Sequence, residues 1–412
     1  MTGALRRLAV DVRPLRDSPG FRSLWIGQSI AYVAWRMMLV LVPVQVYRLT
    51  GSTLDVGLAS LIQFVPLVVF TIIGGGLADT RDRRRLLLLS TLGVAAATAV
   101  FVVVTATGRA SVALVFVLGF VAWSSFSFGA GAIRSLTPRL VPLEQLPAAA
   151  ALNGLYNNLG LVVGPAIAGV LITAIGFSAT YGVSLAGMVL SLFAVIRLPA
   201  VPPNEDAPRM SVGTIVDGFR YLRTQHIVLS FFIIDTLAMV LGMPQSLFPA
   251  LAQHVFADPA SVGYLFAAPA VGAFLISLFS GWAMRVRHQG RAIVVAVTAW
   301  GAIIALFGIT HTLWIGLVLL GLAGAADQVS AIFRSTIVLT VTPDHMRGRL
   351  GGIEFAQVAS TPSLGNLEAG VVAQLTSLRF SIVSGGIACI AATLVVAALF
   401  PILFRYDAHA RT

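Results

Sequence analysis

The chain has 412 residues, of which 58% are hydrophobic and only 10% are charged, whereas an ordinary soluble domain is about 45–50% apolar and about 25% charged. This composition excludes a soluble globular protein. The formal net charge is +11 and all 27 basic residues are arginines, so their positions must be known before nucleic-acid binding is considered.

Twelve segments with few charges follow one another along the chain. Each is long enough to cross a bilayer core, which takes about 20 apolar residues as a helix. Lipid permits only helices or closed barrels, and the sequence lacks the alternation of barrel strands. The predicted fold class is an all-α integral membrane protein with 12 transmembrane helices. The predicted helices cover residues 23–47, 54–78, 86–107, 111–136, 147–175, 180–197, 227–251, 260–284, 292–310, 312–340, 350–376 and 380–404.

The arginines orient these helices, because short cytoplasmic loops collect basic residues. With the N-terminus inside, Arg48, Arg109 and Arg379 lie outside and Arg36 lies within a span, while every other arginine lies on the cytoplasmic side. We therefore expect a multi-pass protein of the cytoplasmic (inner) membrane with both termini in the cytoplasm. The excess of arginines then faces the anionic inner leaflet, so we expect no nucleic-acid partner.

The first predicted helix carries a polar and aromatic stripe, which is unfavourable against lipid and favours a central cavity. Predicted helices 111–136 and 147–175 add further aromatic and amide side chains. Aromatic residues in membrane helices are most often packing residues, and that alternative stays open. As a wall beside an arginine they suit a planar, partly anionic ligand. The predicted substrate-cavity residues are Gln28, Tyr32, Trp35, Arg36, Trp123, Tyr156, Asn157, Met239 and Gln357.

The loop after the second predicted helix reads Gly75-Gly76-Leu77-Ala78-Asp79-Thr80-Arg81-Asp82-Arg83-Arg84-Arg85. Glycine permits close helix approach, and the basic run holds the loop in the cytoplasm. We interpret Gly75, Asp79, Arg83 and Arg84 as a gating loop that supports conformational switching. The plainer alternative is that the loop is only a topology signal.

The fifth predicted helix contains Gly160, Gly164, Pro165 and Gly169 at regular spacing. Small residues four apart form a close-packing face, and proline frees a backbone carbonyl of the preceding turn. A pliant, tightly packed helix follows from this pattern. A plain packing motif is the alternative, since such spacing is common in membrane helices.

The two halves of the chain are related by an internal repeat, in which Gly164 matches Gly365 and other matches keep the same order. We predict an N-terminal six-helix bundle over residues 1–197, a cytoplasmic linker over 198–223 and a C-terminal six-helix bundle over 224–412. A duplicated bundle of this kind is a transporter architecture, with the substrate site near the bilayer midplane between the halves.

These motifs resemble those of the major facilitator superfamily. The loop is similar to its signature loop, and the glycine-proline pattern is similar to its antiporter motif, which is found in exporters. Over nearly the whole chain the sequence resembles the enterobactin (siderophore) exporter branch, which also contains macrolide and multidrug efflux relatives. The segments that carry this resemblance include Phe21-Arg22, Pro43-Val44-Gln45, Gly218-Phe219-Arg220-Tyr221-Leu222, Phe248-Pro249-Ala250-Leu251-Ala252 and Val262-Gly263-Tyr264-Leu265.

The resemblance implies the major facilitator fold and secondary export, with three departures. The family's usual glycine three positions after Asp79 is Asp82 here. The second copy of the loop has Arg285 where the first has Asp79. The fourth predicted helix lacks the mid-membrane arginine that many proton-coupled drug exporters carry. Their proton relay is therefore not carried over to this chain.

Ionisable residues inside spans cost about 2.5 to 3.5 kcal/mol at the helix centre on insertion scales, which makes them functional candidates. We predict Asp235, Asp327 and Glu368 as proton-coupling residues, without deciding which of them titrates. Arg36 lies at a depth comparable to that of Asp235, so the two could pair, either as an exchanging pair or as a static one. Glu354 is expected to pair with a loop arginine.

Arg334, near the cytoplasmic end of its predicted helix, is expected to be an anchor. The six histidines fall at helix ends, loops or the tail, and a nucleotide-binding P-loop is impossible without lysine. We therefore expect no metal, no cofactor and no enzymatic activity.

The predicted function is a secondary active exporter, by proton antiport, of a siderophore-like small molecule, catecholate or similar. The alternative is a macrolide or multidrug efflux pump of the same branch; a non-transporting membrane protein or a membrane enzyme is less favoured. The expected partners are the small-molecule substrate, protons and the lipid bilayer, and the protein is expected to be a monomer.

Overall fold

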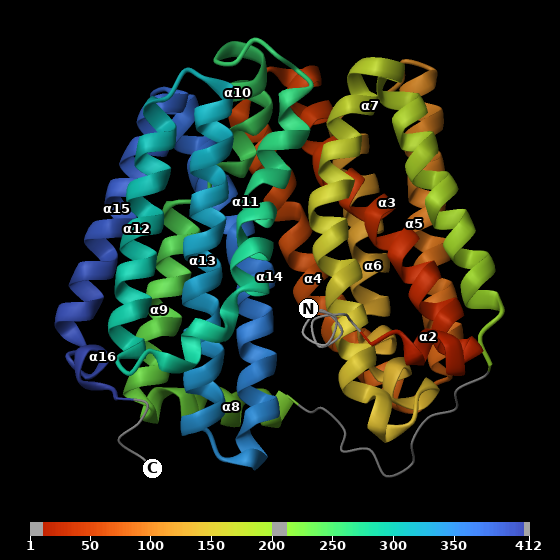
Figure 1. Ribbon diagram of the computed structural model, residues 1–412. Coiled ribbons are helices and arrows are strands. Elements are labelled where there is room, and N and C mark those ends of the chain that lie inside the picture. The colour runs from red at the N-terminus through yellow and green to blue at the C-terminus, as the bar shows by residue number, and fades with distance from the viewer. Residues whose placement is uncertain (1–10, 200–211, 408–412) are drawn as a thin grey trace, which may run out of the picture. The chain divides into compact units, whose positions relative to one another are not determined.

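The computed structural model describes residues 11–199 and 212–407, and within these ranges all regular secondary structure is helical (Figure 1). Three short 3-10 helices accompany the α-helices. The α-helices are α2 (Arg13–Asp17), α3 (Pro19–Thr50), α4 (Thr53–Thr80), α5 (Arg83–Ala106), α6 (Val112–Leu140), α7 (Leu146–Ile196), α8 (Val212–Thr224), α9 (His226–Leu241), α10 (Phe248–His254), α11 (Ser261–Leu278), α12 (Gln289–Ile309), α13 (Leu313–Val341), α14 (Asp344–Leu375), α15 (Leu378–Leu399) and α16 (Ile402–Arg405).

The predicted twelve-helix membrane fold is confirmed. Ten helical stretches of the described chain are long and apolar enough to cross a membrane. One of them contains all of α7, which is two helices joined at Gly176, where φ is 81° and ψ is 171°. The predicted helix 350–376 corresponds to α14, which has the length but whose sequence is too polar to count among the apolar stretches.

Short polar residues begin several helices and glycines follow their ends, as helix capping requires. The side chain of Asp82 accepts a hydrogen bond of 2.9 Å from the backbone N–H of Arg84 at the start of α5. Ser377 accepts one of 3.1 Å from the N–H of Phe380 at the start of α15. Gly108, just past α5, has a φ of 67° that only glycine adopts readily.

The first compact unit comprises residues 1–42 and 65–209. In this unit α5 packs against α6 and α7. One apolar core of the unit contains leucines of α3, α5 and α6 with Val195 near the end of α7. The unit contains the polar stripe of α3 and the glycine motif of α7, so both belong to one packed body.

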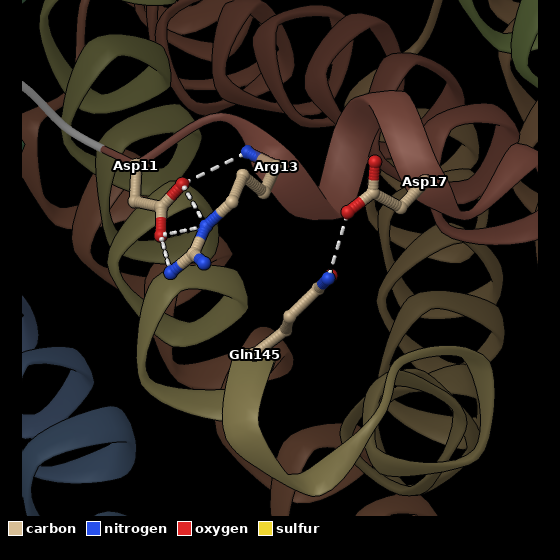
Figure 2. A network of polar contacts seen from close by, with 4 residues as sticks. All are labelled: Asp11, Arg13, Asp17 and Gln145. Atoms are coloured by element: carbon tan, nitrogen blue, oxygen red, sulfur yellow. Dashed lines mark hydrogen bonds and ion pairs between the residues drawn. The ribbon is translucent and has the colours of Figure 1, made fainter.

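Polar contacts at the start of the first unit fix α2 (Figure 2). Asp11 pairs with Arg13 at 2.7 Å, and the hydrogen bonds from Arg13 lower the pKa of the Asp11 carboxyl below its usual value. The side-chain N–H of Gln145, just before α7, donates to Asp17 at 2.8 Å. This bond ties the end of α2 to the start of α7.

The second compact unit comprises residues 43–64 and 210–412. In this unit α12 packs against α13 and α15, and α11 packs against α13 (Figure 1). The unit boundary at residues 209 and 210 lies inside the predicted linker, part of which is the helix α8. Residues 43–64, which come from the end of α3 and the start of α4, pack with this unit, so the compact units differ there from the predicted halves of the sequence.

Candidate substrate and coupling sites

A cluster of one cation and two phenols lies on the first unit. Arg36 follows Tyr32 by one turn of α3, and its Nη2 donates a hydrogen bond to the Tyr32 hydroxyl. The guanidinium carbon lies 4.7 Å from the centre of the Tyr32 ring. Tyr156 of α7 meets Tyr32 edge-on, with ring centres 5.9 Å apart. Among the residues that the structure describes, no carboxylate forms an ion pair with Arg36, and its Nε is buried without a hydrogen-bond partner.

The glycine motif of α7 packs directly on this polar stripe. A Cβ atom added to Gly160 would collide with the Tyr32 ring. One added to Gly164 would lie 2.5 Å from the Cβ of Arg36 and 2.8 Å from the carbonyl oxygen of Val33. The motif residues are all buried in α7, Pro165 and Gly169 included. The motif therefore sets the distance between α7 and the residues that hold Arg36.

The other aromatic residues predicted for the cavity make helix packing contacts. Trp35 is only 2% exposed; its ring stacks on Phe126 at 4.3 Å and meets Trp123 edge-on at 4.7 Å. Gln28 is also buried. These contacts give Trp35 a structural role, because a buried and stacked ring has no face left for a ligand.

Asn157 is held by its own helix. Its side-chain N–H donates to the carbonyl oxygen of Asn153 at 2.8 Å, and the Asn153 amide donates to the Thr137 hydroxyl of α6 at 3.1 Å. The predicted aromatic and polar wall is thus divided. Tyr32, Arg36 and Tyr156 form one cluster, while Trp35 and Trp123 join α3 to α6.

The second unit contains a buried ion pair between Asp235 of α9 and Arg334 of α13. Both residues are 5% exposed. Gln357 of α14 donates its side-chain N–H to Asp235 Oδ2 at 3.2 Å, and also contacts the Phe232 carbonyl and the Thr236 hydroxyl at 2.9 Å each. Asp235 therefore has a charged partner and a further donor, as a buried carboxylate requires.

Two predictions are corrected here. The sequence suggested Arg36 as the partner of Asp235 and an anchoring role for Arg334, but Asp235 pairs with Arg334. The reason is depth, because Arg334 lies two turns before the end of α13 and would be a buried, uncompensated charge without a carboxylate. One feature of the sequence pointed to this polar cluster. Gln357 and Glu354 lie one turn apart on α14 and form a polar edge of that helix, which requires polar neighbours.

A cavity of about 100 Å³ lies inside the second unit, next to this pair. Its wall contains both Asp235, which is buried, and Asp327 of α13, which is exposed. Met239 lines it as well, and so does Trp300 of α12, which the sequence did not single out. Two of the three predicted proton-coupling residues therefore share one cavity.

Glu354 and Glu368 of α14 do not line this cavity. Both are half-buried, and Glu354 interacts electrostatically with Arg334. Arg349, one of the two arginines expected near Glu354, lies in α14 itself and pairs with Asp217 of α8 at 3.5 Å. Glu354 is therefore a neighbour of the Asp235–Arg334 pair, and neither acidic residue of α14 belongs to the cavity wall.

One residue of the predicted gating loop, Arg84, binds the end of a neighbouring helix. The guanidinium of Arg84 donates to the carbonyl oxygen of Ile196, the last residue of α7, and Arg83 is buried. In the second unit Arg291, near the start of α12, donates to the carbonyl of Phe404 at 3.0 Å. An arginine at a helix C-terminus is favourable because the exposed carbonyls there carry negative partial charge.

These contacts tie the start of α5 to the end of α7, and the start of α12 to the short helix α16 that follows α15. Gly75 lies on α4 where it passes α6, since a Cβ added to Gly131 would be 2.9 Å from the Gly75 Cα. The side chain of Asp79 lies outside what the structure describes. The switching role of the loop thus stays a prediction.

A family model described as a transmembrane secretion effector matches residues 10–409 of the chain. The chain belongs to this family. With it the resemblance to the major facilitator superfamily is confirmed. Enterobactin exporter EntS of Shigella boydii is 31% identical over 382 residues, which cover 90% of this chain and 89% of the relative. Enterobactin exporter EntS of Escherichia coli is also 31% identical over the same shares of both chains.

Solved structures show the same fold at low sequence identity. A mutant of the nucleoside transporter NupG has a TM-score of 0.75 at 14% identity, over 93% of this chain and 99% of that one. A mutant of the peptide transporter POT has a TM-score of 0.75 at 13% identity, over 94% and 95%. The family and these structural similarities show that the chain is a multi-pass membrane protein. It is a secondary transporter that exports a small molecule, and it is not an enzyme.

Proposed function

We propose that this transporter exports a siderophore-like molecule, catecholate or similar, across the cytoplasmic membrane in exchange for protons. The curated relatives that carry an enterobactin exporter name support the substrate class. The observation that carries the proposal is the environment of the Arg36 side chain. It is a cation with no carboxylate partner among the described residues, and it is flanked by the rings of Tyr32 and Tyr156.

The chemistry of this cluster fits a catecholate. A guanidinium forms strong, charge-assisted hydrogen bonds with adjacent anionic oxygens and stacks on aromatic faces. A phenol beside it adds a donor or acceptor and an aromatic edge for a planar ring. The carboxylates of the second unit supply the acidic groups that proton exchange requires.

Inside-out membrane vesicles test both parts of the proposal. With an acidic interior, which mimics the exterior of the cell, the vesicles should accumulate enterobactin, and an ionophore that collapses the pH gradient should abolish the accumulation. Absence of enterobactin uptake together with uptake of a macrolide would favour the multidrug alternative. Uptake that survives collapse of the gradient would exclude proton antiport.

Substitution of Arg36 tests its role in binding. A hydrogen bond to a charged group contributes about 1.5–3 kcal/mol, so Arg36→Gln should raise KM for enterobactin roughly 10- to 100-fold. Arg36→Lys should recover part of the loss, because it keeps the charge without the planar fork. Arg16→Gln, which removes an exposed arginine of α2, is the matched control. An unchanged KM in Arg36→Gln would remove the cluster from the binding site.

We also propose that the protein is a monomer with both termini in the cytoplasm. In a Cys389→Ser background, a membrane-impermeant maleimide applied to intact cells should label the Arg109→Cys variant and not the Arg285→Cys variant. The reverse labelling would contradict this topology.

A further inference from the structure

The cavity of the second unit joins an exposed carboxylate to a buried one. Asp327 lies at an exposed position of its wall, and Asp235 is 5% exposed. The volume of about 100 Å³ is the space open to the centre of a water molecule. About 10–15 Å³ of such space is enough for one water molecule, so this cavity has room for several. The lining also includes the amide of Gln245, which gives such water a third polar neighbour.

Asp235 and Asp327 differ in whether a charged partner compensates the carboxylate. Asp235 is paired with Arg334 and accepts a hydrogen bond from Gln357. Asp327 has no ion pair and no hydrogen bond within the described part of the chain. Protonation of Asp235 would leave a charged guanidinium buried and unpaired, whereas protonation of Asp327 breaks no existing interaction.

A buried hydroxyl stands between the two groups. Ser330 lies one turn after Asp327 and one turn before Arg334 on α13, so the three share one face of the helix. It is fully buried and its Oγ has no hydrogen-bond partner. Ser330 itself does not line the cavity, but a buried unsatisfied hydroxyl on the same helix face as Asp327 is a typical position for an ordered water molecule.

We propose that this cavity is a water-binding site within the C-terminal bundle, that Asp327 is the carboxylate there which takes up and releases the coupling proton, and that the Asp235–Arg334 pair stays intact. The proposal rests on the proton antiport proposed above and names its residue. The proton passes from a hydronium ion in the cavity to a carboxylate oxygen of Asp327 and leaves a water molecule behind.

Few charged groups lie near Asp327. Among the residues that line the cavity, Asp235 is the only other titratable group, and the walls from α11 and α12 contribute Pro269, Val297, Trp300 and Ile304. On its own helix Arg334 lies two turns away, engaged with Asp235, and Glu354 of α14 neighbours that arginine. The proton therefore enters a site where no free cation competes for Asp327.

Infrared spectroscopy of the protein in lipid tests the proton site without transport. The pH-difference spectrum should contain the C=O band of a protonated carboxyl group, which Asp327→Asn removes. The band should persist in Asp235→Asn and in the control Glu144→Gln, which removes a carboxylate of the loop before α7. A band that survives Asp327→Asn, or that disappears only in Asp235→Asn, would overturn the assignment.

Hydroxyl-radical labelling by radiolysis tests the water, because bound water is the source of the radicals. Met239 and Met243 line the cavity and should be oxidised several-fold faster than Met188, which is 3% exposed in α7. Ala323→Leu, which places a larger side chain in the cavity wall, should reduce that labelling. Equal labelling of the three methionines would show a dry cavity and contradict the proposal.

Transport then separates this inference from the proposed function. Asp327→Asn should lose enterobactin accumulation driven by a pH gradient and keep enterobactin exchange across the membrane without a gradient. If the variant keeps gradient-driven accumulation, the inference fails and proton antiport stands. If the wild-type protein shows no gradient-driven accumulation, proton antiport fails, and the infrared and labelling results still decide whether Asp327 binds a proton in a hydrated cavity.

Discussion

Single residues show where the sequence was sufficient and where it was not. The cost of burying a charge singled out Asp235 and Asp327, and both lie at one cavity. The partner of Asp235 could not be chosen in the same way, because helix periodicity places a residue on a face but does not say which face meets which helix. The sequence offered Arg36 as the partner and gave Arg334 an anchoring role at a helix end, and only packing of α9 against α13 and α14 selects Arg334.

The ion pair gives a prediction for the stability of the second unit. Arg334→Gln leaves the Asp235 carboxylate buried without its counter-ion, which typically costs about 3–5 kcal/mol. We therefore expect a strongly lowered melting temperature of the detergent-purified protein. The double variant Asp235→Asn/Arg334→Gln removes both charges and should recover most of this loss. Arg16→Gln is the control, and a double variant less stable than Arg334→Gln would contradict the assignment of the pair.

At the scale of elements, the length of apolar segments predicted the helices well, because a bilayer imposes that length. The predicted helices 147–175 and 180–197 leave a break that begins at Gly176, and the structure has its break at this residue, inside the single element α7. The break in the seventh predicted helix was not foreseen. There α9 ends at Leu241, and a 3-10 helix over Pro244–Leu247 leads into α10. Gly242 and Pro244 were the available signal, and apolar length alone ignores both.

The contact between α3 and α7 predicts a functional effect of a single methyl group. Gly164→Ala places a Cβ 2.5 Å from that of Arg36 and 2.8 Å from the Val33 carbonyl, so the two helices must move apart and Arg36 must shift. We expect export to fall severely while membrane insertion is kept. Gly154→Ala on the same helix, where nothing lies within 4 Å, should export normally. Normal export by Gly164→Ala would show that this contact is not needed.

The turn inside α7 predicts an effect on stability alone. Gly176 has a φ of 81° and a ψ of 171°, a region that is essentially restricted to glycine and costs about 1–3 kcal/mol for other residues. Gly176→Ala should therefore lower the melting temperature, whereas the control Gly182→Ala, in open space on the same element, should not. Equal melting temperatures for the two variants would mean that the turn relaxes without strain.

At the scale of the whole molecule, the repeat in the sequence predicted two bundles, but the compact units do not follow the sequence halves everywhere. Residues 43–64, the end of α3 and the start of α4, belong to the second unit, whereas the other parts of these two helices belong to the first. Thr53 donates its hydroxyl to the Gly370 carbonyl of α14 at 3.1 Å, and a Cβ added to Gly57 would lie 2.8 Å from the Asn366 carbonyl. Such backbone proximity comes from small residues, which a hydropathy pattern does not register.

This contact has a consequence for transport. Arg48 places residues 43–64 on the side predicted to be extracellular, and α3 and α4 both continue from there into the first unit. An exporter that works by alternating access must open on that side to release its substrate. We therefore predict that the contact of Thr53 with α14 breaks in each transport cycle.

Cross-linking tests this step. The Thr53 hydroxyl lies 3.5 Å from the Gln374 side-chain oxygen, one turn beyond Gly370 on α14. In a Cys389→Ser background, Thr53→Cys/Gln374→Cys bridged by a short bifunctional thiol reagent should stop export, and reduction of the bridge should restore it. Each single variant treated with the same reagent is the control. Undiminished export by the bridged protein would mean that residues 43–64 move together with α14, and that the extracellular opening forms elsewhere in the molecule.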